Sequence, residues 1–533
     1  MENKSKNRTL LFASLLGLII GVLLSLVSMK VSYNNRIKAT AESWRKLNLL
    51  LGAVQDNYVD TVNVGELTDA AISGALAKLD PHSVYLPPVD LKEAQTALDG
   101  NFDGIGIQFN VPNDTAIVLE VISGGPSEKA GLQTGDRILK VGDENIAGVQ
   151  FPQDSMVRRM KGPAGTKVSI LVERAGETIP FEITRGKIPV HSVDASFMID
   201  GRTGYLRLSK FSRTTFQEVV KAMAELSDAG MEHLVFDIRD NTGGYLDQAL
   251  SLSNMFLKKG DEIVSLKGRN RKPEVYRADG KGFFPDLELS VLINENSASS
   301  SEIFAGAIQD NDRGVILGRR SFGKGLVQEP FNLTDGSGIR LTVARYYTPS
   351  GRCIQKPYSD DYGYDIYRRY ADGELFDRDS IKIDSTSAYT TRSGRTVYGG
   401  GGIIPDIFVP IDTTRATNYF IACNKKASMM RYASHVFEKY RSRLTEIDDY
   451  KELDAFLDSI DIPSGFQDFA RRRDGIVAAP GEWERTVPYI IPQLRALVGR
   501  YSSLGENAFY KLYLPVDDVV MLAVESAGRV EDL

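Results

Sequence analysis

The sequence is poor in the residues that most often build metal sites and disulfide frameworks. Its 533 residues include only two cysteines and four histidines. They are Cys353, Cys423, His82, His191, His233 and His435. Two cysteines exclude a disulfide framework, and no Cys/His cluster has the spacing of a metal site. We therefore expect no metal and no cofactor, and a histidine-based mechanism has few candidate residues.

A strong net charge and an unusual composition are also absent. The formal net charge is −6, which does not favour a nucleic-acid partner. Hydrophobic residues make up 42% of the chain and charged residues 25%, as in ordinary globular proteins. The length predicts about two to four domains, each with its own core.

A long apolar run lies near the amino terminus. Basic residues within positions 4–8 precede an uncharged stretch from about Leu10 to Met29. About 20 apolar residues are enough for a helix to cross a bilayer, and the basic flank would stay in the cytoplasm. We therefore predict a single-pass anchor in the inner membrane within residues 1–30, with the rest of the chain in the periplasm or elsewhere outside the cytoplasm. A cleaved signal peptide is the alternative, and it would also send the rest of the chain across the membrane.

The remaining chain divides into four regions by pattern. Residues 31–88 follow helical spacing, and residues 89–187 contain short β-branched strands between glycine turns, typical of a compact, partly open β-barrel. In residues 188–412, the apolar runs Leu234–Ile238 and Leu289–Ile293 are typical of buried strands. Each leads into a glycine- or serine-rich turn and then a helix, which predicts an α/β core. Residues 413–533 are expected to be mostly helical, without recognisable chemistry.

A serine-rich turn follows one buried strand of the predicted core. Residues Asn296–Gly306 read N-S-A-S-S-S-E-I-F-A-G. This arrangement presents a serine hydroxyl at a helix amino terminus, where free backbone N–H groups can stabilise an oxyanion. However, Ser299 and Glu302 also match a capping box, which commonly does no more than start a helix. The segment alone leaves both interpretations open.

A second segment places a lysine between two glycines. Gly318–Lys324 matches the phosphate-loop spacing G-x-x-x-x-G-K, but Gly325 stands where Ser or Thr should hold magnesium, and a strand is expected to follow. We therefore reject a nucleotide site. Because burial lowers the pKa of a lysine, a buried Lys324 is suited to act as a general base. A lysine in a surface turn is the alternative.

Two glycine-rich segments offer main-chain N–H groups. Asp237–Gly244 ends a strand in a polar turn that closes on paired glycines. Gly104-Ile105-Gly106 offers consecutive N–H groups suited to a terminal carboxylate, and the strand edge that follows can pair with an extended peptide. Each segment by itself also fits a turn that binds no ligand.

The order and spacing of these segments resemble the C-terminal processing peptidase (tail-specific protease) family. The matching segments are Leu79–Ser83, Gly104–Ile107, Gly204–Leu208, Asp237–Gly244, Ser297–Glu302, Phe322–Gly325, Tyr347–Arg352 and Gly402–Asp406. They extend over most of the chain between the apolar run and the helical C-terminal region. The resemblance implies a ClpP/crotonase-like α/β catalytic core with an inserted PDZ domain, a helical N-terminal segment and a helical C-terminal region.

The resemblance also implies a role for individual residues. The nucleophile would be Ser299, the base Lys324, and the residue that orients the base Gln328. Oxyanion donors would come from the N–H of Ser300 and from the turn of Gly243 and Gly244. The PDZ peptide site would include Gly104, Ile105, Gly106 and Ile107. The sequence departs from the family pattern at two places. Ser300 stands in place of a common alanine and should not remove the backbone donor, and Asp240–Thr242 stand in place of a G-N-P variant, a change that we expect to be tolerated.

The predicted function is that of a membrane-anchored serine endopeptidase that processes or degrades proteins from or near their C-termini through an acyl-enzyme. The predicted partners are proteins or peptides with free C-termini, the membrane, and, through residues 413–533, a homo-oligomer or an adaptor. The alternative is a catalytically silent PDZ scaffold or a regulator of another protease.

Overall fold

The computed structural model describes residues 44–111, 114–359 and 362–526. The chain divides into two compact units, with the boundary between Tyr85 and Leu86. The elements from α3 (Pro88–Leu98) onward belong to the second unit.

The described part of the first unit is mainly helical, as predicted for this region. Residues 44–57 form a helix, and α2 (Val64–Leu76) follows. Asn63 caps α2, because its side-chain oxygen accepts hydrogen bonds from the N–H groups of Gly65 and Glu66. A side-chain acceptor at this position satisfies N–H groups that have no partner within the helix.

The predicted membrane localisation requires a correction. Within the three described stretches of the chain, no helix combines the length and the apolar composition that a membrane crossing needs. The predicted span at residues 10–29 lies outside the described residues.

The core of the second unit is a mostly parallel six-stranded sheet in the order β10-β11-β12-β15-β16-β21. Its strands are β10 (Val193–Met198), β11 (Thr203–Leu208), β12 (His233–Asp237), β15 (Glu288–Ile293), β16 (Val315–Gly318) and β21 (Ile407–Phe408). Only the β10–β11 pair is antiparallel among these neighbours. All five residues of β12 are buried, because strands in the middle of a parallel sheet are covered on both faces.

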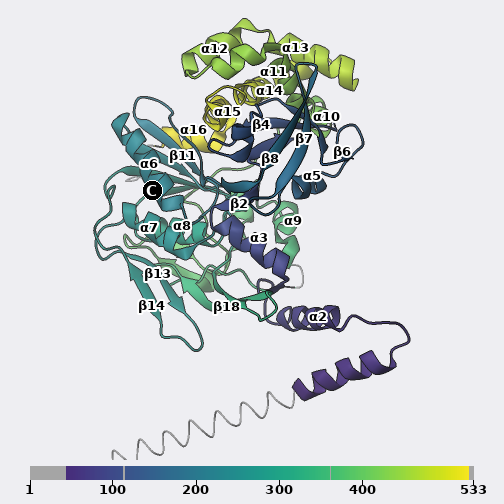
Figure 1. Ribbon diagram of the computed structural model, residues 1–533. Coiled ribbons are helices and arrows are strands. Elements are labelled where there is room, and N and C mark those ends of the chain that lie inside the picture. Colours follow the sequence, from purple (N-terminus) through teal and green to yellow (C-terminus); the bar gives the residue numbers. More distant parts are fainter. Residues whose placement is uncertain (1–43, 112–113, 360–361, 527–533) are drawn as a thin grey trace, which may run out of the picture. The chain divides into compact units, whose positions relative to one another are not determined.

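Three helices pack around this sheet and carry its apolar core (Figure 1). They are α6 (Thr215–Asp228), α7 (Leu246–Phe256) and α8 (Ser300–Asp310). Every residue of α8 is buried. The two apolar runs predicted as buried strands are therefore strands, and each leads through a polar turn into a helix.

A second, antiparallel sheet supplies the strands that follow the lysine-bearing loop. It contains β13 (Glu262–Lys267), β14 (Glu274–Arg277), β17 (Leu326–Asn332) and β18 (Gly338–Tyr347). β18 pairs with β13 on one side and with β17 on the other. The strand predicted after Lys324, in place of a phosphate-loop helix, is confirmed as β17.

The β-rich region forms a sheet in the order β3-β4-β5-β7-β8, with β6 paired to β5. The strands are β3 (Ile107–Asn110), β4 (Ala116–Val121), β5 (Arg137–Val141), β6 (Glu144–Asn145), β7 (Lys167–Arg174) and β8 (Glu177–Thr184), and two helices accompany them, α4 (Pro126–Ala130) and α5 (Gln153–Met160). Where the chain enters and leaves this region, β2 (Asn101–Gly104) pairs antiparallel with β9 (Gly186–Pro189). The region is therefore inserted through a two-stranded stem.

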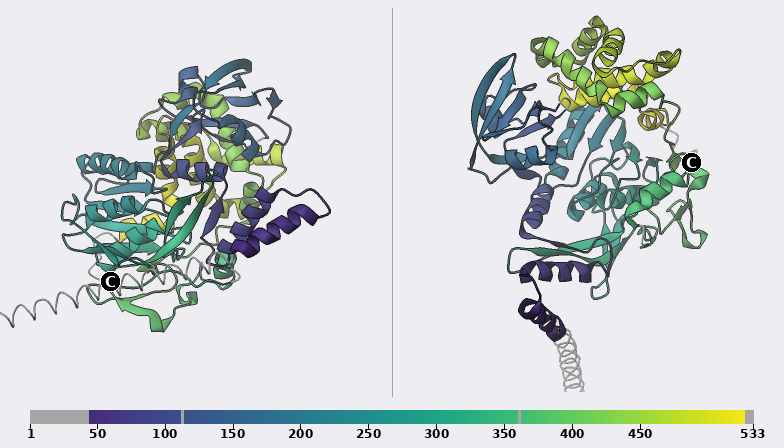
Figure 2. Two further views of the ribbon diagram at one scale, coloured as in Figure 1. Left: turned by 60° about the horizontal axis from the view of Figure 1, so that its bottom comes forward. Right: turned by 90° about the vertical axis from the view of Figure 1, so that its right-hand side faces the viewer.

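The C-terminal region is helical, as predicted. Its helices are α10 (Asn418–Lys425), α11 (Ser428–Glu446), α12 (Tyr450–Ser459), α13 (Ile462–Phe469), α14 (Glu482–Gly499), α15 (Gly505–Tyr513) and α16 (Asp518–Glu525). Figure 2 shows these yellow-green to yellow helices beside both the β-rich region and the core. Arg441 of α11 donates to the main-chain oxygens of Thr134 and Gly135, and Lys511 of α15 donates to that of Met198.

Candidate active site

Ser299 occupies a strained backbone conformation immediately before α8. Its φ is 56° and its ψ is −114°, and a residue other than glycine at such a positive φ costs about 1–3 kcal/mol. Strained positions of this kind occur mostly at functional sites, where the surrounding structure holds them in place. The sharp turn places the Ser299 side chain at the helix amino terminus.

The hydroxyls of the three neighbouring serines are bound within the protein. Ser297 donates to the main-chain oxygen of Ile238, Ser300 to that of Gly244, and Ser301 to that of Asn241. Among the described residues, no main-chain carbonyl accepts the Ser299 hydroxyl. Ser299 is therefore the serine of this run whose hydroxyl is best placed for chemistry.

Asn241 connects the serine turn to the segment Asp237–Gly244. Its main-chain oxygen accepts the N–H of Ala298 at 3.0 Å and the hydroxyl of Ser301 at 2.8 Å. Gly243 then passes so close that a side chain there would meet Ser299 Cβ at 2.8 Å. The glycine at this position permits the close approach.

Two main-chain N–H groups at this junction are open. The N–H of Gly243 donates to Asn241 Oδ1 at 2.9 Å and is therefore already bound. By contrast, the N–H groups of Gly244 and Ser300 donate to no acceptor in the part of the chain that the structure describes. A pair of unsatisfied donors beside a serine is the arrangement that stabilises a developing oxyanion.

The carboxylate of Glu302 connects the serine turn to the lysine loop. Its Oε2 accepts the N–H groups of Ser299 and Lys324, each at 2.9 Å. Its Oε1 accepts the Ser321 hydroxyl at 2.5 Å and the N–H of Gly323 at 2.7 Å. Burial raises the pKa of Glu302, and these hydrogen bonds oppose the shift.

Tyr346 on β18 makes a second connection between the same two segments. Its hydroxyl lies 2.6 Å from the main-chain oxygen of Lys324 and 3.1 Å from that of Ser299. Burial, together with the nearby Glu302 carboxylate, raises the pKa of Tyr346 well above its usual value. The hydroxyl therefore stays protonated and serves as a donor.

The structure places Lys324 in the loop before β17, and Gln328 on β17 itself. Both side chains are partly buried. Gln328 pairs with Thr342 of β18 next to a bulge between Val327 and Gln328. Bulges re-aim side chains near functional sites, and this one lies four residues beyond the lysine.

A buried charge cluster supports the end of β12. Asp237 accepts hydrogen bonds from Tyr205, Arg207 and Arg239 at 2.6–2.9 Å. Burial alone would raise the pKa of Asp237, but the two guanidinium groups lower it below its usual range. Arg239 also pairs with Asp517 at 2.7 Å, so the C-terminal region is attached close to the turn that carries Gly244.

The predicted peptide-binding segment joins β2 to β3. Gly104 ends β2 and Ile107 begins β3, which is an edge strand of its sheet. The main-chain oxygens of Ile105 and Gly106 accept the N–H groups of Ser127 and Ile122. The N–H groups of Ile105 and Gly106 have no acceptor among the described residues, so two open main-chain donors lie next to an edge strand.

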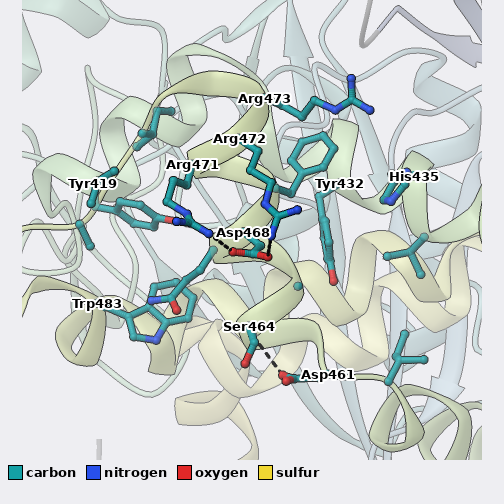
Figure 3. A pocket seen from close by; sticks show the side chains of 18 of the residues that line it. Tyr419, Tyr432, His435, Asp461, Ser464, Asp468, Arg471, Arg472, Arg473 and Trp483 are labelled. Atoms are coloured by element: carbon teal, nitrogen blue, oxygen red, sulfur yellow. Dashed lines mark hydrogen bonds and ion pairs between the residues drawn. The ribbon is translucent and has the colours of Figure 1, made fainter.

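A groove of about 1210 Å³ lies elsewhere, in the helical C-terminal region (Figure 3). Trp483 lines it, and Asp468 within it pairs with Arg471 at 2.6 Å and Arg472 at 2.8 Å. All of its lining residues fall within 419–484. It therefore contains none of the predicted catalytic residues.

Sequence analysis missed three residues that organise the site. The sequence indicates Glu302 only as a helix cap and as the last residue of a matching segment, although the S-x-x-E spacing is a usable signal. Asn241 was noted only as a departure from a family pattern. Tyr346 directly precedes the matching segment Tyr347–Arg352, and no local pattern points to its role.

The family models and the curated relatives agree on the class of protein. The model for "Peptidase family S41" matches residues 202–363, and that for "PDZ domain" matches residues 104–184. A "Carboxy-terminal-processing protease" of Bartonella bacilliformis is 37% identical over 347 residues, which are 64% of this chain and 78% of that protein. A "Probable CtpA-like serine protease" of Staphylococcus aureus is 33% identical over 330 residues, which are 62% of this chain and 65% of that protein. A solved structure, a photosystem II D1 C-terminal processing protease, is 27% identical with a TM-score of 0.36, and covers 68% of this chain and 91% of its own.

Proposed function

Because this chain belongs to peptidase family S41 and is a serine protease of the carboxy-terminal-processing type, we propose that it cleaves peptide bonds with a Ser–Lys dyad. Ser299 attacks the scissile carbonyl, and Lys324 takes the hydroxyl proton and later gives it to the leaving amine. Water then hydrolyses the acyl-enzyme. The observation that carries this assignment is the Glu302 carboxylate, which binds the N–H groups of both residues at 2.9 Å.

The proposed oxyanion donors are the N–H groups of Ser300 and Gly244. Both lie at the junction of the serine turn with the Asp237–Gly244 segment, and neither is bound within the described chain. Gly243 is not among the proposed donors, because its own N–H donates to Asn241. It instead permits the close approach to Ser299, because it has no side chain. Gln328, on the strand after the loop, holds the Lys324 amine without adding charge.

We propose that the PDZ domain binds the C-terminal carboxylate of a substrate at Gly104, Ile105, Gly106 and Ile107. The open N–H groups of Ile105 and Gly106 would hold the carboxylate, and the edge strand β3 would pair with the residues before it. Substrates would thus be proteins cleaved from or near their C-termini.

The proposed domains are a helical N-terminal region at 31–88, a partly open PDZ barrel at 89–187, a ClpP/crotonase-like core at 188–412 and a helical region at 413–533. The antiparallel stem of β2 and β9 supports the last bound of the PDZ domain, whereas its first bound, residue 89, lies within α3 and before the stem. A role of residues 413–533 in an oligomer or in adaptor binding stays a prediction.

The test compares Ser299→Ala and Lys324→Arg with Ser297→Ala and Ser301→Ala. The first two variants should lose turnover by about 10²–10⁴-fold or more, because alanine has no nucleophile and guanidinium does not lose its proton at working pH. The controls should mainly lose stability, because each removes a hydroxyl that donates to a main-chain oxygen. A serine-directed probe should label wild type at Ser299.

Two results would oppose the dyad. One is full activity of Ser299→Ala or Lys324→Arg. The other is loss of activity, without unfolding, after replacement of a single histidine. A folded wild type that neither turns over peptides nor reacts with the probe would instead favour the silent scaffold.

A further inference from the structure

The end of the C-terminal region covers the second face of the catalytic sheet. Buried residues of η5 (Leu514–Val516) and α16 form one apolar cluster with β11, β12, β15 and β16 (Figure 1). On β12 this cluster contains Val235, whereas Leu234 and Phe236 belong to the cluster that contains α6, α7 and α8. Because successive residues of a strand point to opposite faces, α16 lies on the face opposite those three helices.

Two side chains of the C-terminal region also contact the charge cluster at the end of β12. Asp517 accepts hydrogen bonds from both terminal nitrogens of Arg239, at 2.9 and 2.7 Å. The ring of Tyr510, on α15, lies 5.1 Å from the Arg207 guanidinium. Arg207 and Arg239 both donate to the one carboxylate of Asp237. Asp517 therefore supplies Arg239 with a second carboxylate.

The pair of Arg239 and Asp517 is largely buried and ionised. Their side chains are 14% and 13% exposed. Burial alone would lower the pKa of Arg239, but the carboxylates of Asp237 and Asp517 raise it well above its usual value. Two parallel hydrogen bonds between a guanidinium and a carboxylate fix the direction of both groups. Loss of the Asp517 carboxylate would leave a buried guanidinium that shares its remaining partner with Arg207.

Arg239 begins the turn that carries the proposed oxyanion donor Gly244. The next residue, Asp240, has a φ of 61°, a strained conformation that persists only where the surrounding structure holds it. Asn294 holds the turn from the catalytic core, because it accepts the Asp240 N–H at 2.9 Å and donates to Asp240 Oδ1 at 2.8 Å. Asp517 holds the preceding residue from the C-terminal region.

Asp517 has two interactions, and only one of them needs a negative charge. Its Oδ1 accepts the N–H of Val520 at 3.3 Å and so caps α16. Asparagine or serine can fill that role equally well. The apolar cluster already holds α16 on the sheet. The carboxylate is therefore matched to Arg239, at the start of the catalytic turn.

We propose that Asp517 is a positioning residue for the oxyanion site. It fixes Arg239, and thereby the strained turn that presents the Gly244 N–H to the developing oxyanion. The C-terminal region thus completes the catalytic site without touching the substrate. This inference rests on the proposed function of Ser299 and on the proposed donor Gly244.

The test uses the full chain carrying Asp517→Asn or Asp517→Ser, which remove the charge and keep a residue able to cap α16. The substrate is a synthetic peptide that spans the first bond that wild type cleaves in β-casein. The inhibitor is the boronic acid made from the acyl part of that peptide. Active sites are counted by complete labelling with a fluorophosphonate, so that unfolded protein does not enter kcat.

We expect kcat of both variants to fall by about 10- to 100-fold, with KM within about twofold of wild type. Removal of one oxyanion donor costs about 10²–10³-fold in kcat, and here the donor is misplaced but still present. The adduct of Ser299 with the boronic acid is a tetrahedral anion that resembles the transition state. Its Ki should therefore rise by the same factor by which kcat/KM falls. A loss of stability alone would change neither kcat per active site nor this Ki.

The matched control is Asp518→Ser. Asp518 is the next residue and pairs with Arg415 within the C-terminal region at 2.5 Å. This variant should keep kcat and Ki within about twofold of wild type. If Asp517→Ser does not fold, Asp517→Asn, which keeps the shape of the side chain, decides the question.

Three results would overturn the inference. They are wild-type kcat in the folded Asp517 variants, a fall in kcat with an unchanged Ki for the boronic acid, and an equal loss in Asp518→Ser. A Ser299→Ala variant that still cleaves the peptide would instead reject the proposed function itself, whatever the Asp517 variants do.

Discussion

The main-chain nitrogens of Ser299 and Lys324 donate to the same carboxylate oxygen, Oε2 of Glu302, each at 2.9 Å. The two residues come from different segments, one before α8 and one before β17. A single buried carboxylate therefore sets the spacing between the proposed nucleophile and the proposed base. Tyr346 adds a second connection, because its hydroxyl lies within hydrogen-bond distance of the main-chain oxygens of the same two residues.

Glu302→Gln should reduce kcat/KM by roughly 10²-fold, because a small misplacement of catalytic groups costs that much. The amide nitrogen of glutamine would face N–H donors where a carboxylate oxygen now accepts them. The free energy of unfolding should fall by about 1–3 kcal/mol for each donor left buried and unpaired. Steady-state kinetics and denaturant unfolding measure the two effects.

Glu295→Gln is the control for this prediction. Glu295 precedes the same helix and pairs with Arg319 at 2.8 Å. It should leave kcat/KM within about threefold of wild type, because the N–H groups of Ser299 and Lys324 donate to Glu302 and not to Glu295. Wild-type activity in Glu302→Gln would show that the shared carboxylate is not needed.

Tyr346→Phe should lower kcat by about tenfold with KM nearly unchanged, because the hydroxyl positions catalytic residues and does not contact substrate. It should also cost about 1–2 kcal/mol of stability, since a main-chain oxygen loses its buried donor. The neighbouring Tyr347→Phe is the matched control, because no described residue hydrogen-bonds to the Tyr347 hydroxyl. Equal kcat values in the two variants would contradict the role of Tyr346.

Burial of His233 predicts that the folded protein loses stability as the pH falls below 7. Burial lowers its pKa from 6.5 to about 4, and its Nε2 lies 2.9 Å from Ser290 Oγ. The unfolded chain therefore takes up a proton as the pH falls through 6.5, while the folded chain does so only near pH 4. This difference should remove up to about 3 kcal/mol of stability between these pH values.

Denaturant unfolding at pH 7, 6, 5 and 4.5 measures this effect. His233→Gln should flatten the pH dependence relative to its own value at pH 7. An unchanged slope in His233→Gln would assign the acid sensitivity to other groups.

Arg441→Ala should loosen the contact between the PDZ domain and α11. The guanidinium donates to the main-chain oxygens of Thr134 and Gly135 at 2.7 and 2.6 Å. Losing two charge-assisted bonds should raise hydrogen exchange in this turn by about tenfold or more. The rate of Ser299 labelling should stay the same, because the contact does not touch the catalytic site.

Arg443→Ala serves as the comparison for Arg441→Ala. Arg443 pairs with Glu452 inside the C-terminal region at 2.6 Å. Loss of this ion pair should leave the rate of hydrogen exchange in the Thr134–Gly135 turn unchanged. Equal hydrogen-exchange rates in the two variants would mean that Arg441 does not hold the PDZ domain against α11.

The sequence by itself determined the class of protein and the order of its parts. Apolar runs of strand length predicted β12 and β15, since burial on both faces of a parallel sheet requires them. The serine turn and its capping glutamate predicted the start of α8, because capping is a local interaction. The ordered motifs identified a serine protease with a PDZ domain, and the family match confirms this.

Only the tertiary structure decided how the site is held together. Glu302 accepts hydrogen bonds from residues 19 to 22 positions later in the chain. The Tyr346 hydroxyl contacts the main-chain oxygen of Ser299, 47 positions earlier. The structure also shows that the N–H of Gly243 donates to Asn241 Oδ1 in its own turn, whereas the N–H of Gly244 has no acceptor among the described residues. These pairings depend on the register of strands and loops far apart in the chain, and hydrophobic periodicity reports only on neighbours along one element.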